Sequence, residues 1–200
     1  MSIPLAHLVD DDEAIRDALS WLLKSRGIPC AAYASAENFL AAWSKDMAGC
    51  VVLDMRMSGQ SGLDCFDQLV ARESTLPVIF LTGHGDVPLA VATLKKGAFD
   101  FFEKPFNDND LASRVEEAIA LDARQRAANA TVDSVNARIS TLTTRERQIM
   151  DLVLAGKFNK VIADELNISM RTVEVHRANL FDKMQVKTAV ELANLLKPGH

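Results

Sequence analysis

The sequence of 200 residues predicts an α/β domain with a doubly wound five-stranded parallel sheet, followed by a small all-α domain. Short apolar runs alternate with amphipathic segments in the first half of the chain, and no strand pattern remains after residue 140. The charge also changes sign, because residues 1–120 carry a net charge of −8 and residues 121–200 one of +3. We therefore expect two domains with different partners.

Five short apolar runs predict the strands, and amphipathic segments between them predict the covering helices. The runs are residues 5–9, 30–34, 50–53, 78–81 and 99–102. Each run is short and nearly all apolar, which is typical of a parallel strand buried on both faces. Helices are predicted from residue 14 to an end at Gly27, after Ser35, and onward from Gly62, Val87 and Asn107.

The composition excludes several classes of protein. Hydrophobic residues make up 48% and charged residues 24%, as in an ordinary globular chain. No apolar run is long enough to span a bilayer and no secretory signal precedes Asp10, so we expect a cytoplasmic protein with no membrane partner. Cys30, Cys50 and Cys65 form no Cys-x-x-Cys pair, which predicts buried thiols rather than a zinc site or a disulfide framework.

Polar side chains lie at the ends of four predicted strands, in the order Asp10 and Asp11, Asp54, Thr82, Lys104. Ligands of open α/β sheets bind at these carboxyl ends. One aspartate there is usually a solvated loop residue, but that does not explain the whole set. Three converging carboxylates need a counter-ion, and Mg²⁺ prefers carboxylates, waters and a phosphate oxygen. The site is therefore suited to a phosphoryl group, with Asp54 as its nucleophile.

Four motifs of this part of the chain resemble the receiver domain of bacterial two-component response regulators. They are Val9-Asp10-Asp11-Asp12 with Arg16, Leu53-Asp54-Met55-Arg56-Met57, Leu81-Thr82-Gly83 and Glu103-Lys104-Pro105-Phe106. The resemblance covers residues 3–120, so that we place a receiver domain at 1–120. It implies a flavodoxin-like fold in which a sensor histidine kinase transfers a phosphoryl group to Asp54.

The resemblance also implies a role for each polar residue. Mg²⁺ would bind directly to Asp11, Asp54 and the backbone carbonyl of Arg56, and through water to Asp10. Thr82 and Lys104 would contact phosphoryl oxygens, and a cis Lys104–Pro105 bond would direct the lysine. Asp12 would be a surface or helix-entry residue, and Arg56 and His84 would flank the phosphoryl group. Ser58 stands where the family usually has proline, which predicts a more mobile loop.

The resemblance implies that phosphorylation switches the receiver through Thr82 and Phe101. A phosphoryl group on Asp54 would draw the Thr82 hydroxyl inward, and the ring of Phe101 would then turn into the space that this leaves. The surface affected would be the fourth helix, the fifth strand and the fifth helix. An alternative is that Phe101 is a static core residue, since other phenylalanines surround it.

Residues 107–142 contain no proline or glycine, and we place a helical linker at 121–139. Leu111, Ala118, Gln125, Val132 and Ile139 recur every seven residues, which is a weak heptad pattern. Two alternatives remain open. The segment is either a flexible or single-helix tether, or an extension of the fifth helix that pairs in a dimer.

Residues 140–200 carry only helix signals, and we place a second domain there. These signals are a capping box at Thr143-x-x-Glu146, an end at Gly156, caps at Asn159 and Ser169, a tight turn at Asn167-Ile168 and a last helix over 188–196. Two short helices joined by a tight turn indicate a helix-turn-helix. On the third helix, Val173, Leu180 and Met184 fall on one predicted core side, opposite Arg171, Val175, Ala178 and Asp182.

Three motifs of this domain resemble the LuxR-type DNA-binding domain. They are Leu142-Thr143-x-Arg145-Glu146-Arg147, Gly156-Lys157-x-Asn159-Lys160-x-Ile162-Ala163 and Ile168-Ser169-x-Arg171-Thr172-Val173-Glu174-x-His176-Arg177. The resemblance implies base contacts from Glu174, Val175 and Ala178, and phosphate contacts from Asn159, Lys160, Arg171, Thr172, His176, Arg177 and Lys183. Glu174 either accepts a hydrogen bond from a cytosine N4 amino group or orients Arg177.

Both halves together resemble a response regulator of the NarL/FixJ type. The resemblance implies a transcription regulator with Mg²⁺ as cofactor, and not an enzyme. Its partners would be a histidine kinase, double-stranded DNA with a near-palindromic site, and a second copy of the chain after phosphorylation. An Asp-nucleophile phosphatase is disfavoured because such enzymes carry Asp-x-Asp, whereas this chain has Asp54-x-Arg56. A phosphorylation-controlled interaction module without a DNA role is the third alternative.

Overall fold

The computed structural model describes residues 3–83 and 87–197. The chain divides into two compact units, Met1–Arg126 and Ala127–His200. Within the described ranges, no helix combines the length and the apolar character that crossing a membrane requires.

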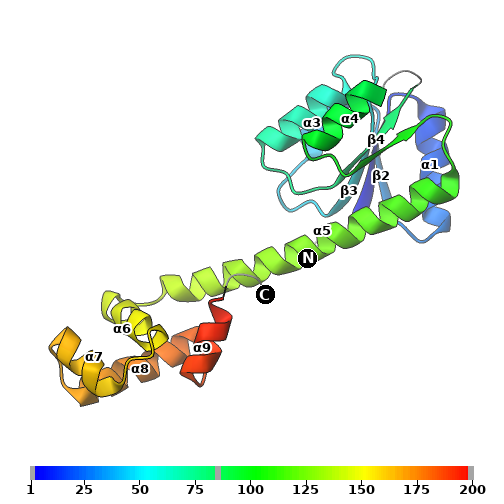
Figure 1. The fold of residues 1–200 in the computed structure, drawn as a ribbon. Helices are drawn as coiled ribbons and strands as arrows, with labels where there is room; N and C mark the ends of the chain where they lie inside the picture. The colour runs from blue at the N-terminus through cyan, green and yellow to red at the C-terminus, as the bar shows by residue number, and fades with distance from the viewer. Residues whose placement is uncertain (1–2, 84–86, 198–200) are drawn as a thin grey trace. The chain divides into compact units, whose positions relative to one another are not determined.

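The first unit is built on a five-stranded parallel sheet with the strand order β2-β1-β3-β4-β5 (Figure 1). This arrangement confirms the predicted doubly wound α/β class. The strands are β1 (Leu5–Val9), β2 (Cys30–Tyr33), β3 (Gly49–Asp54), β4 (Val78–Thr82) and β5 (Asp100–Glu103). Because β1 and β3 are hydrogen-bonded neighbours, the polar residues that follow them meet at one edge of the sheet.

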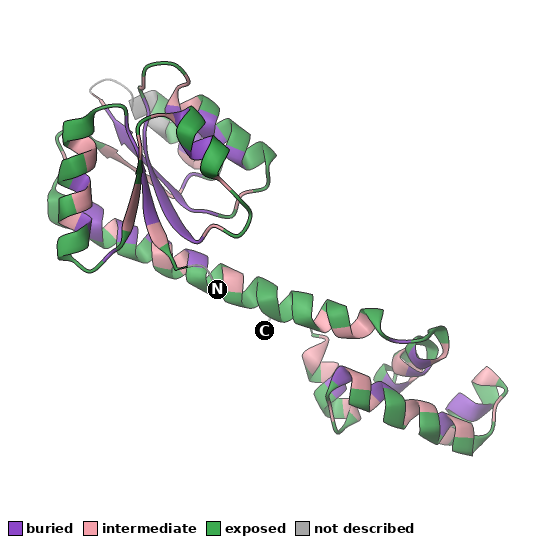
Figure 2. Ribbon diagram, turned by 180° about the vertical axis from the view of Figure 1, so that it is seen from behind, coloured by how far each residue is buried: buried purple, intermediate pink, exposed green. Residues whose placement is uncertain are grey.

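Helices cover both faces of the sheet, as its nearly all-apolar strands require (Figure 1). One face carries α1 (Glu13–Ser25) and the first half of α5 (Asp108–Ser140), and the other carries α2 (Ala36–Ala42), α3 (Gly62–Ala71) and α4 (Val87–Lys95). The six residues of β3 and the five of β4 are all buried, so the core runs through the middle of the sheet (Figure 2). Cys50 and Cys65 are buried as predicted, whereas Cys30 is half-buried.

Helix α5 is tied to the strand β3 at the edge opposite the acidic residues. The Asp122 carboxylate is 1% exposed and accepts a hydrogen bond of 2.8 Å from the Gly49 backbone N–H. It also pairs with the Arg126 guanidinium, whose other nitrogens donate to backbone carbonyls of Met47 and Lys45. A side chain at Gly49 would collide with the Leu5 carbonyl at 1.9 Å, so only glycine allows this approach.

The predicted linker is helical, since α5 continues to Ser140 and the boundary between the two units falls within it. The structure thus has a helix and no flexible segment over the described residues 121–139, which agrees with a single-helix tether as well as with an extension of the fifth helix. Whether this helix pairs with a second copy stays a prediction.

The second unit packs four further helices around a small core, with the helices α6 (Thr144–Leu154), α7 (Asn159–Leu166), α8 (Met170–Met184) and α9 (Ala189–Leu195). Thr143 and Glu146 form the predicted capping box, and Ser169 caps α8 as expected. Asn167 adopts the left-handed conformation that the turn before α8 needs. The expectation that Asn159 caps α7 is wrong. Phe158 occupies the cap position, and the Asn159 side chain accepts a hydrogen bond from Arg177 instead.

Candidate functional site

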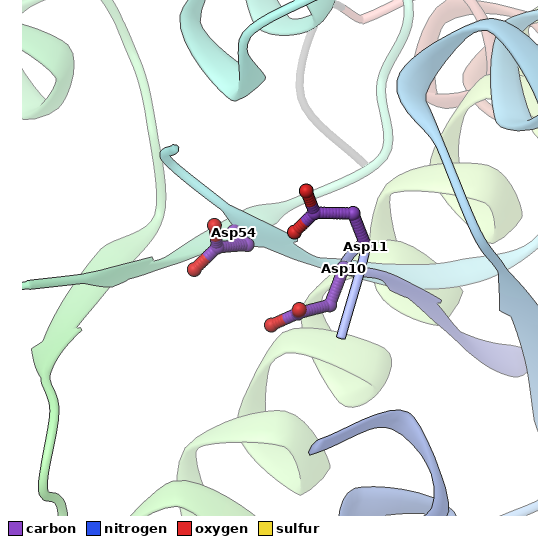
Figure 3. Close-up of side chains that lie close together, drawn as sticks. All are labelled: Asp10, Asp11 and Asp54. Atoms are coloured by element: carbon purple, nitrogen blue, oxygen red, sulfur yellow. The ribbon is translucent and has the colours of Figure 1, made fainter. Parts of the chain in front are cut away.

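Three carboxylates meet at the carboxyl edge of the sheet (Figure 3). Asp10 and Asp11 follow β1, and Asp54 is the last residue of β3. One oxygen from each lies within 4.8 Å of the other two. Asp10 is 2% and Asp54 6% exposed, whereas Asp11 faces solvent. The structure therefore brings together the three acidic residues that the sequence singles out.

Lys104 is the cation that contacts two of these carboxylates. Its ammonium lies 2.5 Å from Asp54 Oδ1 and 3.0 Å from Asp10 Oδ2. It follows β5, and the Lys104–Pro105 peptide bond is cis as expected. Three carboxylates and one ammonium leave an excess of negative charge at this edge if all are ionised.

Backbone N–H groups hold each carboxylate in place. Asp54 Oδ2 accepts from the Arg56 N–H at 3.0 Å, and Asp10 Oδ1 accepts from the Asp12 N–H at 2.9 Å. Asp11 Oδ2 accepts from the Ser58 N–H at 2.7 Å. These bonds fix the directions of the carboxylate oxygens before any ligand is present.

The electrostatics of the site differ between its buried and exposed members. Burial raises the pKa of Asp54, and the contact with Lys104 opposes that shift. Burial alone would lower the pKa of Lys104, but the hydrogen bonds and charges of Asp54 and Asp10 outweigh it and raise the pKa. The pKa of Asp11 is lowered, chiefly by the Ser58 N–H. Asp11 is thus held in its charged form, whereas the charge on Asp54 is costly.

The donor set fits a divalent cation. The carboxylates supply the hard oxygen ligands that Mg²⁺ prefers. Two of them already bind one cation, the Lys104 ammonium. The start of α3 also lies close to the end of β3. A side chain at Gly62 would meet the Asp54 carbonyl oxygen at 2.1 Å, so this approach requires glycine. The expected Mg²⁺ contact from the Arg56 carbonyl remains a prediction.

The two expected switch residues lie on neighbouring strands. Thr82 ends β4, is 1% exposed, and donates its hydroxyl to the Gly83 carbonyl at 3.1 Å. Phe101 lies on β5, is half-buried and packs against the core cluster beneath α3 and α4. These positions suit a switch and a static core residue equally, so both readings of Phe101 stay open. His84, expected to flank the phosphoryl group, lies outside the described residues.

Helix α8 has the two faces that its sequence predicts. Val173, Leu180 and Met184 are fully buried, which confirms the predicted core side. The opposite face is exposed and includes Val175 at 53%. The exposed residues on this helix include the expected base contacts Glu174, Val175 and Ala178, together with Arg171 and Asp182.

Several of the expected phosphate contacts are engaged within the second unit. Arg177 donates to Asn159 Oδ1 at 3.0 Å and stacks over the Phe181 ring. Lys183 pairs at 2.7 Å with Glu146, which is 3% exposed. Of the others, Lys160 and Arg171 are exposed, whereas Thr172 and His176 are half-buried and the Thr172 hydroxyl contacts Ser169 Oγ at 2.8 Å.

Three supporting groups were missed by the sequence analysis. Ser58 holds Asp11, Arg16 donates to the Asp10 carbonyl at 2.8 Å, and the Asp12 N–H holds Asp10. Asp12 itself caps α1, which agrees with its expected helix-entry role. Backbone donors leave no mark on side-chain patterns. The one available signal was the serine at a position where the family usually has proline, which lacks an N–H.

An acidic edge of this kind, on a five-stranded doubly wound sheet that shares a chain with a helix-turn-helix unit, defines a DNA-binding response regulator. Comparison with known families agrees. The response regulator receiver domain matches residues 6–116, and the family of bacterial regulatory proteins of the luxR type matches residues 140–196. The chain belongs to the two-component response regulators of the NarL/FixJ type.

Curated relatives and a solved structure resemble the chain over nearly its whole length. The C4-dicarboxylate transport transcriptional regulatory protein DctR of Rhodobacter capsulatus is 48% identical, over 94% of this chain and 97% of that protein. The transcriptional regulatory protein FixJ of Bradyrhizobium diazoefficiens is 43% identical, over 94% and 92%. The solved structure of the response regulator StyR is 39% identical with a TM-score of 0.93, over 98% of both chains.

Proposed function

We propose that Asp54 accepts a phosphoryl group from a sensor histidine kinase, and that phosphorylation promotes pairing with a second copy and binding to DNA. The observation that carries this proposal is the excess of carboxylates at the carboxyl edge of the sheet, where Asp10, Asp11 and Asp54 converge and Lys104 contacts two of them. Such a site is suited to a divalent cation and to the oxygens of a phosphoryl group.

The transfer itself is a nucleophilic displacement at phosphorus. An oxygen of Asp54 attacks the phosphorus of a phosphohistidine, the O–P bond forms as the P–N bond breaks, and the imidazole nitrogen keeps the electron pair. Asp11, Asp54 and the Arg56 carbonyl would hold Mg²⁺ directly, with Asp10 acting through water. When bound, the cation neutralises charge on the phosphoryl oxygens.

Lys104 and Thr82 would respond to the new group. The Lys104 ammonium, 2.5 Å from Asp54 Oδ1, is placed to pair with a phosphoryl oxygen once Asp54 is phosphorylated. The Thr82 hydroxyl would exchange its bond to the Gly83 carbonyl for one to a phosphoryl oxygen. The half-buried ring of Phe101 would then turn inward and change the surface of α4, β5 and α5.

The second unit would place α8 in the major groove of double-stranded DNA. Its exposed face carries Glu174, Val175 and Ala178, whose side chains are short enough to let the helix approach the edges of the bases. Exposed cations such as Lys160 and Arg171 flank that face and would bind phosphates. Val190 is 70% exposed on α9, which supports α9 as the surface that pairs two units on a near-palindromic site.

The proposed phosphorylation is tested by light scattering after size exclusion, with Mg²⁺, with and without beryllofluoride, on wild type and Asp54→Asn. Beryllofluoride binds an aspartate in the manner of a phosphoryl group. We expect a dimer only for treated wild type. A dimer in every sample would indicate that α5 pairs whether or not Asp54 is phosphorylated. A monomer in every sample would contradict phosphorylation-driven pairing.

DNA binding needs a test of its own, because an interaction module without a DNA role would share the acidic site. Removal of residues 1–139 should leave a fragment that binds DNA, since its four helices share one core. We expect Val175→Asp to abolish this binding while the helical circular dichroism is retained, because the exposed side chain lies on the proposed base-reading face. Failure of the fragment and the full chain to bind any DNA would contradict the proposed role.

A further inference from the structure

The loop between β3 and α3 donates alternate backbone N–H groups to three carboxylates. The N–H groups of Arg56, Ser58 and Gln60 bond to Asp54, Asp11 and Glu37 at 3.0, 2.7 and 3.0 Å. Two of these carboxylates belong to the acidic site, and Glu37 lies on α2. The loop is therefore attached both to the site and to a helix beside it.

Asp11 depends on this loop more than its neighbours do. Asp10 and Asp54 are buried and both contact Lys104, so packing and an ion pair already fix them. Asp11 is exposed, and its bond to the Ser58 N–H, at 2.7 Å, is shorter than the N–H bonds to Asp10 and Asp54. Without it, the carboxylate would sample several rotamers in solvent.

The bond leaves Asp11 able to bind a cation. The Ser58 N–H uses Oδ2, and a carboxylate has a second oxygen for a metal. Groups that hydrogen-bond a metal ligand fix its direction, and their loss typically weakens metal binding about 10- to 100-fold.

We propose that the Ser58 backbone N–H is a positioning group that orients Asp11 for the divalent cation. The proposal rests on the Mg²⁺ site of the proposed function. It also explains what a serine at this position contributes, since a proline there would supply no N–H. The same bond attaches the loop to Asp11 at Ser58, and the greater mobility expected from the missing proline stays a prediction.

The test compares Ser58→Pro with Ser58→Ala in the full chain. Ser58→Pro removes both the N–H and the hydroxyl, which also bonds to Asp11, whereas Ser58→Ala removes only the hydroxyl and keeps the N–H. Gln60→Pro is the matched control, because it places proline in the same loop and removes the analogous bond to Glu37, away from the acidic site. The readout is the Mg²⁺ dissociation constant of the unphosphorylated chain, from NMR amide shifts.

We expect Ser58→Pro to raise the dissociation constant about tenfold, Gln60→Pro to stay close to wild type, and Ser58→Ala, which keeps the N–H, to raise it by less than Ser58→Pro does. Phosphorylation by acetyl phosphate should then need about tenfold more Mg²⁺ for half its maximal rate, with the maximal rate itself retained. Equal or tighter binding by Ser58→Pro would overturn the positioning role. Wild type that binds no Mg²⁺ would instead overturn the proposed metal site.

A folding defect is distinguished by a second variant. Replacing Ser58 by its α-hydroxy acid exchanges the N–H for an ester oxygen and leaves the loop free of proline's constraint. We expect the same tenfold loss of Mg²⁺ affinity, with thermal unfolding in EDTA close to that of wild type. Wild-type affinity in the ester variant would overturn the proposal, whatever Ser58→Pro does.

Discussion

The buried carboxylates of the two edges of the sheet differ in how their charge is balanced. Asp10 and Asp54, at the carboxyl edge, share the Lys104 ammonium and lie beside the further carboxylate of Asp11. Asp122, at the opposite edge, has its own guanidinium from Arg126 and a backbone N–H from Gly49. Even with the Arg16 guanidinium, which donates to the Asp10 backbone carbonyl, the three carboxylates of the first edge outnumber the two cations named there, whereas Asp122 has a cation of its own.

The second unit repeats the balanced arrangement. Glu146 is buried and accepts from the Thr143 N–H and from the Lys183 ammonium, both on Oε2. Removal of either partner from such a buried pair is strongly destabilising, because it leaves the other charge or donor without compensation. A set of carboxylates that outnumbers its cations is suited to a further cation. Charge balance thus distinguishes Asp122 and Glu146 from the carboxylates of the proposed metal site, whereas burial alone does not.

The largest expected effect comes from breaking the balanced pair of the receiver. Asp122→Ala leaves the Arg126 guanidinium and the Gly49 N–H without their acceptor, so we expect a loss of about 3 kcal/mol in the free energy of unfolding. Trp21 and Trp43 both lie in the first unit, so urea unfolding followed by tryptophan fluorescence reports on that unit. Glu116→Ala, an exposed carboxylate on the same helix, is the control. Equal effects would show that Asp122 is not a structural carboxylate.

Addition of a metal ion should raise the free energy of unfolding, through binding at the carboxyl edge of the sheet. A ligand that binds only the folded state stabilises it by about 2.7 kcal/mol at one hundred times its dissociation constant. We expect Mg²⁺ at that concentration to raise the tryptophan-detected free energy of unfolding by this amount, and EDTA to reverse the gain. The same Mg²⁺ concentration should leave Asp54→Asn nearly unchanged. A full gain in that variant would place the cation elsewhere.

Breaking the balanced pair of the second unit should cost somewhat less. Glu146→Ala removes half of the capping box and the acceptor of Lys183, which is partly exposed and can find water, so we expect a loss of about 2 kcal/mol. The measurement is urea unfolding of the fragment 127–200 by circular dichroism. Glu165→Ala, whose pair with Lys157 is exposed, should cost under about 1 kcal/mol. A larger loss for Glu165→Ala would reverse the assigned roles.

The smallest expected effect is a pH dependence of the second unit. Burial would raise the pKa of Glu146, but Lys183 and Thr143 outweigh it and lower the pKa in the folded state. The unfolded state then binds the proton first, so this contribution is complete above the unfolded pKa of about 4.3 and falls as the pH drops through that value and the folded pKa. Thermal unfolding of 127–200 between pH 6 and 3 should show a steeper fall than in Glu146→Gln. Parallel curves would contradict this assignment.

Much of the fold and of the site follows from sequence because both depend on short periodic patterns. The strands, their carboxyl-edge aspartates and the core side of α8 were all predicted, since continuous apolar runs and helical spacing record burial directly. The Asn159 cap was wrong because α7 starts one residue earlier than the sequence suggested: Phe158 occupies the cap position, and Asn159 is already the first helical residue, with its side chain bonded to Arg177. The bond from the Ser58 N–H to Asp11 and the bond from the Gly49 N–H to Asp122 depend on tertiary approach, which local patterns do not encode.

The central claim is that the carboxyl edge, alone among the buried carboxylates described, has an unbalanced charge that recruits a cation. It is tested most directly by titrating Mn²⁺ into the metal-free, ¹⁵N-labelled full chain and following paramagnetic broadening of the amide signals. We predict that the signals of Asp10, Asp11 and Ser58 broaden first, while those of Asp122 and Glu146 stay sharp. Early broadening around Asp122 or Glu146, or none at the carboxyl edge, would contradict the account.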